Sequence, residues 1–128
     1  MDTPAPALEG VKVVEFAHVI AGPLAGTLLA DLGAEVVHVE PPDVGDAGRA
    51  MGPAKDGVPL WWKVAARNKR SVRLDLRQPE GRELAHRLAR WADVVITNVR
   101  VDTLARWGLD WPALHAVNEA LVYLQITG

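Results

Sequence analysis

The 128-residue chain contains no cysteine, which excludes disulfide bonds, thiolate metal sites and a cysteine nucleophile. It contains a single serine, Ser71, with no evident base beside it in the sequence, so a serine hydrolase is disfavoured. No apolar run reaches the roughly 18 residues that a membrane-spanning helix needs. The first ten residues also lack the basic start and the apolar stretch of a signal peptide. We therefore expect a cytoplasmic protein that does not enter a membrane.

A strong charge of either sign is also missing. The formal net charge of −2 gives no basic field for nucleic acid and no polybasic patch for a membrane surface. No two of the four histidines stand at metal-ligand spacing with a carboxylate partner, so we predict no metal site. At this length the chain corresponds to one domain, or to part of one, and is long enough to bury a core.

The clearest pattern in the chain is a β-α-β unit within residues 11–40. An apolar strand-like run, Val11–Phe16, is followed by a loop, Ala17–Pro23, and by a helix-like run that ends at Gly33. A second strand-like run, Ala34–Glu40, is nearly continuously apolar. The helix carries leucines at helical spacing, which predicts one apolar face: Leu24, Leu28, Leu29 and Leu32. Folds of this kind place a ligand at the loop after the first strand.

Strand-like and helix-like segments continue to alternate after residue 60. The patterns predict strands over Ser71–Leu76, Asp93–Val99 and Leu121–Ile126, and helices over Pro79–Trp91, Asp102–Trp107 and Asp110–Val117. Asp110 is expected to cap its helix. The prediction is an α/β protein with a Rossmann-like, doubly wound, mostly parallel sheet. Residues 41–60 indicate a long irregular loop, and residues 1–9 a loose N-terminus.

The residues of the first loop allow more than one interpretation. Their glycines permit close backbone approach, and the start of the following helix offers free N–H groups to an anion. The loop matches neither GxGxxG nor GxxxxGK[ST], so a tight packing turn is the more common explanation. Glu40 ends the second strand where a nicotinamide-binding protein has an acidic residue, although the glycine pattern is missing. His18 could act as an acid or base, or could be a hydrogen-bonded structural residue.

Polar residues elsewhere have a functional and a structural interpretation. Asn68-Lys69-Arg70 and Arg77 put positive charge beside a strand, which suits phosphates but also describes a solvated surface. Asn98 ends a buried strand where open α/β sheets bind ligands, yet it also suits a strand-end turn. Arg106 has the position of an ordinary helix-surface charge. His38, within an apolar strand, is expected to be a satisfied core or edge residue.

Several sequence segments in one register go beyond a generic α/β pattern. They begin with LEGVKVVEFAHVIAGPLAGTLLADLGAEVVHVEPP, continue through NKRSVRLDL, PEG and ADVVITN, and end with LARWGL and ITG. Together they resemble the start of the class III CoA-transferases, a family that includes formyl-CoA transferase, carnitine CoA-transferase and α-methylacyl-CoA racemase. The resemblance covers nearly the whole chain. It implies that residues 1–128 are the N-terminal part of a large domain, which a returning C-terminal segment completes in an interlocked homodimer.

The resemblance also implies a coenzyme A site. Nine residues map onto positions that line this site in the family: His18, Val19, Ile20, Ala21, Leu74, Arg77, Asn98, Val99 and Arg106. Two single positions and one short stretch depart from the family pattern. Pro41 stands where an arginine often lies near the adenine, and Val99 stands in place of a phenylalanine. Arg100-Val101-Asp102 replaces the usual Arg-Pro-Gly.

The catalytic groups of the family lie past the Ile-Thr-Gly motif that ends this chain. They are the aspartate that forms an acyl anhydride and then a CoA thioester in the transferases, and the histidine and aspartate of the racemases. We therefore expect residues 1–128 to contain no catalytic residue and to be inactive alone.

The expected function is CoA binding within an enzyme that moves CoA between carboxylic acids. The alternatives are part of an α-methylacyl-CoA racemase and a non-catalytic nucleotide-binding or assembly subunit. The expected partners are acyl-CoA, a carboxylic acid, and a second copy or a partner chain that completes the domain. A partner is expected because unpaired sheet edges and apolar patches would otherwise be exposed.

Overall fold

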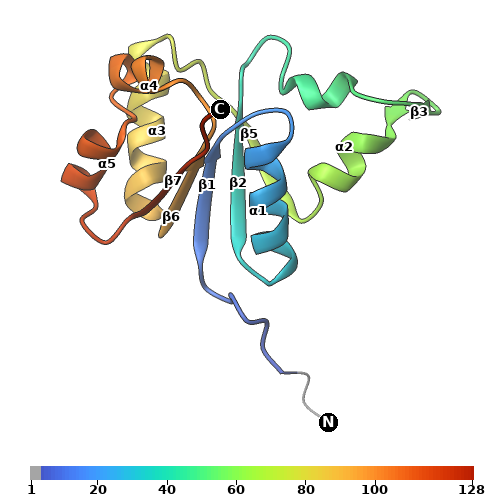
Figure 1. The fold of residues 1–128 in the computed structure, drawn as a ribbon, viewed down its shortest axis with the longest axis horizontal. Coiled ribbons are helices and arrows are strands. Elements are labelled where there is room, and N and C mark those ends of the chain that lie inside the picture. The colour runs from blue at the N-terminus through green and yellow to red at the C-terminus, as the bar shows by residue number, and fades with distance from the viewer. Residues whose placement is uncertain (1–3) are drawn as a thin grey trace.

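The computed structural model describes residues 4–128, which form a five-stranded sheet with helices on both faces (Figure 1). The strand order is β5-β2-β1-β6-β7, and every neighbouring pair is parallel. The strands are β1 Lys12–Phe16, β2 Glu35–Glu40, β5 Lys69–Arg73, β6 Val94–Thr97 and β7 Val122–Gln125. The order reverses between β1 and β6, and doubly wound sheets bind ligands at such a switch point. The predicted Rossmann-like, mostly parallel fold is confirmed.

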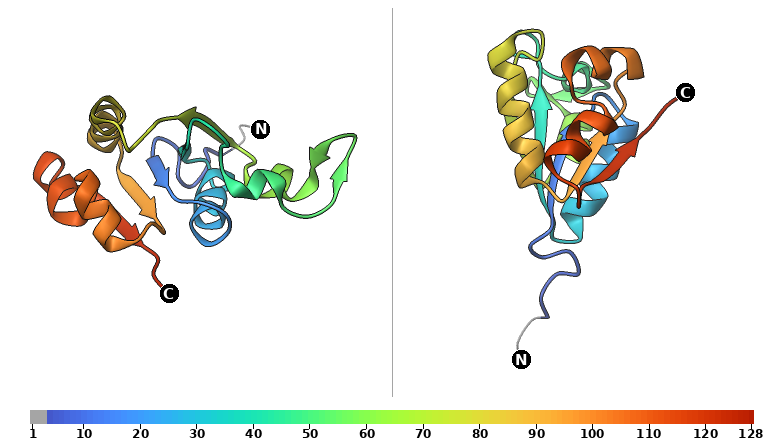
Figure 2. Two further views of the ribbon diagram at one scale, coloured as in Figure 1. Left: turned by 90° about the horizontal axis from the view of Figure 1, so that it is seen from above. Right: turned by 90° about the vertical axis from the view of Figure 1, so that its left-hand side faces the viewer.

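Alternate residues of the central strand pack into different cores on the two faces of the sheet. The helices are α1 Ala21–Asp31, α2 Leu60–Ala65, α3 Pro79–Trp91, α4 Val101–Trp107 and α5 Trp111–Val117. Figure 2 shows α1 on one of these faces and α3, α4 and α5 on the other. Val14 and Phe16 pack in one cluster with residues of α3, α4 and α5, including the fully buried Leu104. Val13 packs on the other face, in a cluster with Ala30 of α1. The period of two along β1 therefore separates the two cores.

Helix α1 packs on the sheet through its small residues rather than through its leucines. Its buried residues are Gly22, Pro23, Gly26, Thr27 and Ala30. Leu24, Leu28 and Leu32 are 41%, 56% and 51% exposed, so three leucines of the predicted apolar face do not point into the core, whereas Leu29 packs partly buried against it. A Cβ atom at Gly26 would lie 1.5 Å from Glu15 Oε1, because the helix backbone passes directly over this buried carboxylate. Small residues permit that approach, and Leu24, Leu28 and Leu32 consequently face outward.

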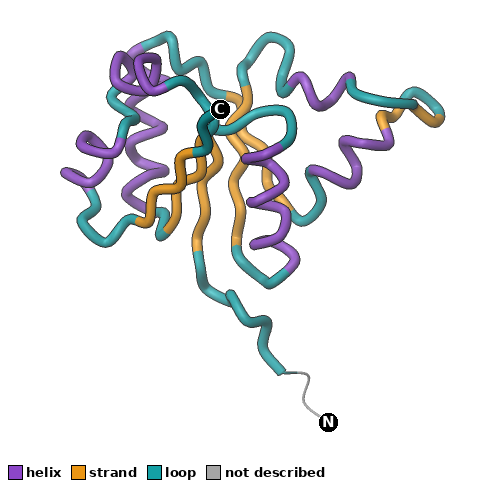
Figure 3. Tube along the Cα trace, viewed as in Figure 1, coloured by secondary structure: helices purple, strands orange, loops and turns teal. Residues whose placement is uncertain are grey.

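The segment between β2 and β5 contains structure that the sequence analysis did not predict (Figure 3). The region expected to be irregular includes the 3-10 helix η1 Ala47–Ala50 and an antiparallel hairpin of β3 Ala54–Lys55 and β4 Val58–Pro59. Helix α2 follows, and its Ala65 carbonyl accepts a hydrogen bond from the Thr27 hydroxyl of α1 at 2.5 Å. Strand β5 lies earlier than the predicted Ser71–Leu76, because it pairs with β2 only as far as Glu40.

The three helices of the second half follow the predicted pattern. Helix α3 spans Pro79–Trp91 as expected. Helix α4 ends at Gly108, whose φ of 66° is the left-handed conformation that favours glycine. Asp110 occupies the N-cap position of α5, but its side chain makes no capping hydrogen bond, which corrects that expectation. Within residues 4–128 no helix is long and apolar enough to cross a membrane.

The N-terminal segment lies against the end of α1. Residues 1–3 of the predicted loose N-terminus lie outside the described residues. Further along, the Leu8 N–H donates to the Leu32 carbonyl at 2.9 Å. The Leu8 side chain packs against the core between α1 and the sheet, so the chain is tied to the domain from this point.

Replacing Leu104 by alanine should lower the free energy of unfolding by about 2–5 kcal/mol, because its fully buried side chain would leave a cavity. The matched variant Leu28→Ala removes the same atoms from a side chain that is 56% exposed, and should cost only about 0.5 kcal/mol. Urea denaturation of the two variants measures the difference. Equal losses would contradict the outward orientation of the α1 leucines.

Candidate functional site

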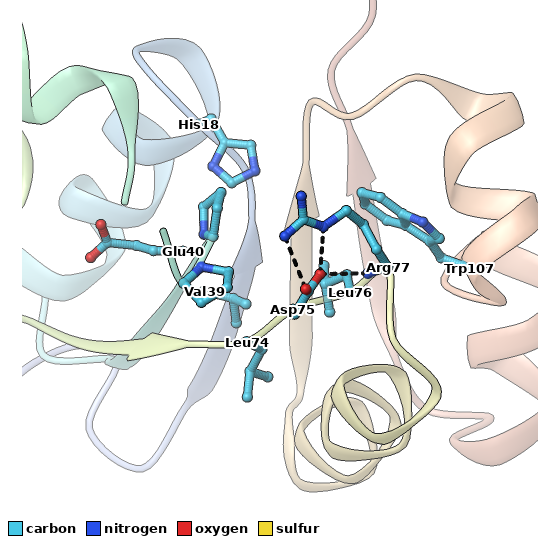
Figure 4. Close-up of a pocket in the computed structure, with 10 residues that line it drawn as sticks. His18, Val39, Glu40, Leu74, Asp75, Leu76, Arg77 and Trp107 are labelled. Carbon is cyan, nitrogen blue, oxygen red and sulfur yellow. Dashed lines mark hydrogen bonds and ion pairs between the residues drawn. The ribbon is translucent and has the colours of Figure 1, made fainter. Parts of the chain in front are cut away.

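A pocket opens at the carboxyl ends of the strands, beside the loop that joins β1 to α1 (Figure 4). Its lining residues are His18, Val39, Glu40, Pro41, Pro42, Leu74, Asp75, Leu76, Arg77 and Trp107. Most of these side chains are apolar, and the polar ones are one imidazole, one guanidinium and the two carboxylates of Glu40 and Asp75. Such a lining suits a ligand that has a flat apolar part and an anionic part.

Two side chains from distant segments hold the β1–α1 loop. Asn98, after β6, accepts the His18 N–H at 2.9 Å and donates its amide to the His18 carbonyl at 2.8 Å. Asp46, from the segment after β2, accepts the Val19 N–H through its two oxygens at 3.0 and 3.2 Å. Val19 has a φ of 70°, a left-handed conformation that costs a β-branched residue about 1–3 kcal/mol. Its neighbours therefore impose the conformation of this loop.

A network of buried charges lies beneath the loop, between the sheet and α1. Glu15 Oε2 lies 2.7 Å from His38 Nδ1, and Asp46 Oδ2 lies 3.1 Å from His38 Nε2. Lys69 Nζ lies 2.8 Å from the other oxygen of Glu15. None of these four side chains is more than 3% exposed. Positive and negative groups thus alternate from β5, through β1 and β2, to the segment that holds the loop.

The two histidines near the pocket carry different charges. Burial alone would lower the pKa of His38, but the hydrogen bonds and charges of Asp46 and Glu15 outweigh burial and raise this pKa to about 9. The His38 ring is therefore an imidazolium at neutral pH. The pKa of His18 is lowered instead, chiefly by burial and against the attraction of Asp46. The His18 ring at the pocket edge is consequently neutral at pH 7.

Glu40 belongs to a second buried cluster and is not available to a ligand. Its carboxylate accepts two hydrogen bonds from Arg49, both at 2.6 Å, one from the Asp46 N–H at 2.8 Å and one from the Ser71 hydroxyl. Burial would raise the pKa of Glu40, but these contacts outweigh burial and lower the pKa to about 2. A carboxylate occupied in this way cannot hold a ribose, which argues against the nicotinamide interpretation.

The structure brings three of the nine predicted site residues to one opening. His18, Leu74 and Arg77 all line the pocket. The Arg77 guanidinium is held by Asp75 at 2.7 Å and by Asp43 at 3.1 Å, and its side chain is 63% exposed. An anionic ligand would therefore meet an accessible cation that already has carboxylate partners.

The other six predicted residues lie around the pocket or apart from it. Three of them continue the chain from His18 into the first turn of α1: Val19, Ile20 and Ala21. The Asn98 side chain is occupied by the β1–α1 loop, and Asn98 and Val99 line a separate hollow. Arg106 lies on the exposed surface of α4, where it donates to the Thr103 hydroxyl and to the Asp102 carbonyl. The structure assigns Asn98 a role in holding the loop that the sequence did not indicate.

The basic cluster after α2 does not point into the pocket. Lys69, interpreted above as a possible phosphate ligand, is buried against Glu15. Its neighbours are also engaged, Asn68 with Asp31 and Arg70 with Glu35. Of the basic residues interpreted above as possible phosphate ligands, Arg77 lies at the pocket, whereas Lys69 and Arg70 are paired elsewhere in the described structure.

Sequence reasoning missed the buried network itself. Glu15 and His38 lie opposite each other in the register of β1 and β2. The presence of two ionisable residues in two apolar strands was the sequence signal that could have predicted this buried pair. Such residues are buried only when they are paired. Asp46 gave no signal, because it lies in a segment without periodicity.

Comparison with known proteins places these features in a family. Residues 8–128 match the model of the family described as CoA-transferase family III. Succinyl-CoA–D-citramalate CoA-transferase of Chloroflexus aurantiacus is 48% identical over 122 residues, which cover 94% of this chain and 30% of the relative. Succinate–glutarate CoA-transferase of Agrobacterium fabrum is 48% identical over 130 residues, which cover 96% of this chain and 32% of the relative.

The fold agrees with a solved structure. A CAIB/BAIF family protein from Brucella suis superimposes with a TM-score of 0.90 at 44% sequence identity. The superposition covers 98% of this chain and 34% of that protein. The chain thus spans about a third of the length of the proteins it matches.

Replacing Asn98 by aspartate should lower the free energy of unfolding by about 1–3 kcal/mol, because a carboxylate oxygen would replace the amide donor that faces the His18 carbonyl. Gln78→Glu makes the same chemical change at an exposed position and should change stability by less than about 0.5 kcal/mol. Urea denaturation at pH 7 compares the two. If Asn98→Asp proved as mild as its control, Asn98 would not be holding the loop.

Proposed function

Because the chain belongs to CoA-transferase family III, we propose that it supplies the CoA-binding N-terminal part of an enzyme that moves CoA between carboxylic acids. The observation that carries this proposal is the pocket at the carboxyl ends of the strands. His18, Leu74 and Arg77, which the family resemblance assigns to CoA, lie together in its lining. The proposal concerns a whole enzyme, since this chain covers only 30% of a relative such as the citramalate transferase.

The pocket offers the kinds of contact that CoA requires. Pro41, Pro42, Leu74 and Trp107 provide apolar surface suited to an adenine ring. Arg77 supplies a guanidinium, which pairs well with a phosphate. Because Asp75 and Asp43 hold that guanidinium in the free chain, we propose that a phosphate of CoA displaces one of these carboxylates.

The β1–α1 loop would receive another part of the ligand. The first turn of α1 carries N–H groups without intrahelical partners and the positive end of the helix dipole, and both favour an anionic group. The neutral His18 ring would bring a polar atom to the same edge without adding charge. Val19, Ile20 and Ala21 would then line CoA chiefly through their backbone and small or apolar side chains.

We propose that the covalent chemistry uses an aspartate that lies beyond residue 128. Its carboxylate would attack the thioester carbonyl and release the CoA thiolate, which leaves an acyl-aspartyl anhydride. The thiolate would then attack the aspartyl carbonyl, release the first carboxylic acid and form an aspartyl-CoA thioester; the second acid would reverse these steps. Among residues 4–128, Asp46 is the one buried aspartate, and its contacts with Val19, Gly48 and His38 prevent it from acting as this nucleophile.

The proposed enzyme also needs further protein around this part. Leu24 and Leu28 of α1 are exposed, and so are Val122 and Leu124 of the edge strand β7, at 61% and 43%. Apolar surface of this extent on a helix and an edge strand is typical of a surface that another segment covers. We propose that the remainder of the enzyme or a second copy covers it.

The 128-residue chain should bind CoA in titration calorimetry, and Arg77→Ala should weaken binding about tenfold, which corresponds to about 1.4 kcal/mol. The loss is modest because the guanidinium is exposed to solvent. Arg90→Ala removes an exposed arginine from α3, outside the pocket, and should leave the affinity unchanged. Absence of CoA binding by the unaltered chain would contradict the proposed function.

The same chain should not transfer CoA from succinyl-CoA to a second carboxylic acid, because the proposed nucleophile lies outside it. Chromatographic separation of the CoA esters after incubation measures the transfer. A rate above that of the protein-free control would overturn the assignment of the nucleophile to a later segment.

A further inference from the structure

Asp46 connects two segments that are far apart in the sequence. Its Oδ1 accepts the Gly48 N–H at 2.7 Å, which closes the turn that begins η1. The same carboxylate accepts the N–H of Val19, 27 residues earlier in the chain. The side chain is fully buried, so no water competes for these contacts. One carboxylate therefore determines how the β1–α1 loop lies against the segment after β2.

The second oxygen of Asp46 faces the charged ring of His38. The ring donates to Glu15 through Nδ1, and its Nε2 lies 3.1 Å from Asp46 Oδ2 in an ion pair; Glu15 is paired in turn with Lys69. Only the imidazolium carries a proton toward each of the two carboxylates, because each neutral tautomer has one N–H. Loss of the proton would leave one carboxylate facing a nitrogen lone pair.

We infer that Asp46 is a positioning residue, and that the His38 imidazolium acts through it to hold His18, Val19 and Ile20 in the conformation that binds the ligand. This inference rests on the proposed CoA function. Asp46 and His38 do not line the pocket; Asp46 reaches the loop through the Val19 N–H, and its Oδ2 also lies 3.9 Å from His18 Nδ1.

The backbone strain at Val19 explains why the loop needs a positioning residue. Without Asp46, the Val19 backbone would relax from its φ of 70° toward the extended or helical region, since the left-handed conformation is unfavourable for valine. That relaxation would turn the neighbouring peptide groups and move the His18 ring, which lies at the pocket edge. Asn98 holds His18 from the other side but makes no contact with the Val19 N–H.

The surroundings of His38 define the direction of the pH dependence. Glu15 faces it from β1 and Asp46 from the segment after β2, while the rings of His18 and Trp62 lie 6.4 and 5.8 Å from its own ring centre. Beyond these lie Lys69, on Glu15, and the pair of Glu40 and Arg49. Because the pKa of His38 is raised to about 9, the β1–α1 loop should keep its conformation at neutral pH and lose it as the pH rises through about 9.

Nuclear magnetic resonance of the 128-residue chain tests the coupling without any ligand. The backbone carbonyl ¹³C shift of His18 reports the peptide group that carries the Val19 N–H, and the His38 ring carbon Cε1 reports its own protonation. Titration from pH 6 to 10 should give one shared midpoint near 9. A His18 carbonyl that does not respond while His38 titrates would overturn the inference, whether or not the chain binds CoA.

Variants of Asp46 then test the effect on binding. Asp46→Ala should shift the His18 carbonyl resonance at pH 7 and weaken CoA binding at least tenfold. In Asp46→Asn, the amide oxygen can still accept the Val19 N–H, and the amide N–H can donate to a neutral His38. The pKa of His38 should therefore fall. In the unaltered chain, CoA affinity should decrease above pH 9. In Asp46→Asn, CoA affinity should instead decrease as the pH falls.

Asp56→Asn is the matched control, because it makes the same change at an exposed position of the same segment. It should reproduce the pH dependence of CoA affinity seen in the unaltered chain, including the part that comes from titration of CoA itself. Identical pH profiles for Asp46→Asn and the control would contradict the positioning role. If the unaltered chain shows the shared midpoint but binds no CoA, the proposed function fails and the coupling between His38 and the loop stands.

Discussion

Three carboxylates and three cations balance one another between the sheet, α1 and the segment after β2. The carboxylates are Glu15, Glu40 and Asp46, and the cations are His38, Lys69 and the partly exposed Arg49. Taking an unpaired charge out of water costs several kcal/mol, so each of these groups requires its partner to be in place. Pairing of charges, as much as apolar packing, therefore determines this face of the domain.

The requirement for pairing explains features that otherwise appear unrelated. Helix α1 crosses Glu15 with a glycine, and its small residues consequently occupy the side that faces the sheet. The segment after β2 folds back over the strand ends, because Asp46 and Arg49 are needed there by His38 and Glu40. The β1–α1 loop in turn takes its conformation from Asp46 and from Asn98. One side of the pocket is thus held in place by buried ion pairs whose charged groups do not face the pocket.

The sequence was sufficient where one local signal dominated. Alternation of strands and helices predicted the sheet, while Pro79 and Gly108 marked helix boundaries that the structure confirms. Predictions failed where tertiary contacts decide: the leucine spacing of α1 did not show which side meets the sheet, and α2 was missed among prolines and glycines. The family resemblance located His18, Leu74 and Arg77, but it could not show that the Asn98 side chain holds the loop, since that role depends on a contact 80 residues away.

The sequence separations of these contacts bear on how the domain folds. Val19 meets Asp46 across 27 residues, Glu15 meets Lys69 across 54, and His18 meets Asn98 across 80. We expect contacts of such long range to form late, because closing a long loop costs chain entropy before the contact itself stabilises the fold. The β1–α1 loop has its full set of contacts only when β6, which is followed by Asn98, has joined the sheet. A ligand of this loop would therefore bind only the completed domain, and would slow its unfolding rather than guide the earlier steps of its assembly.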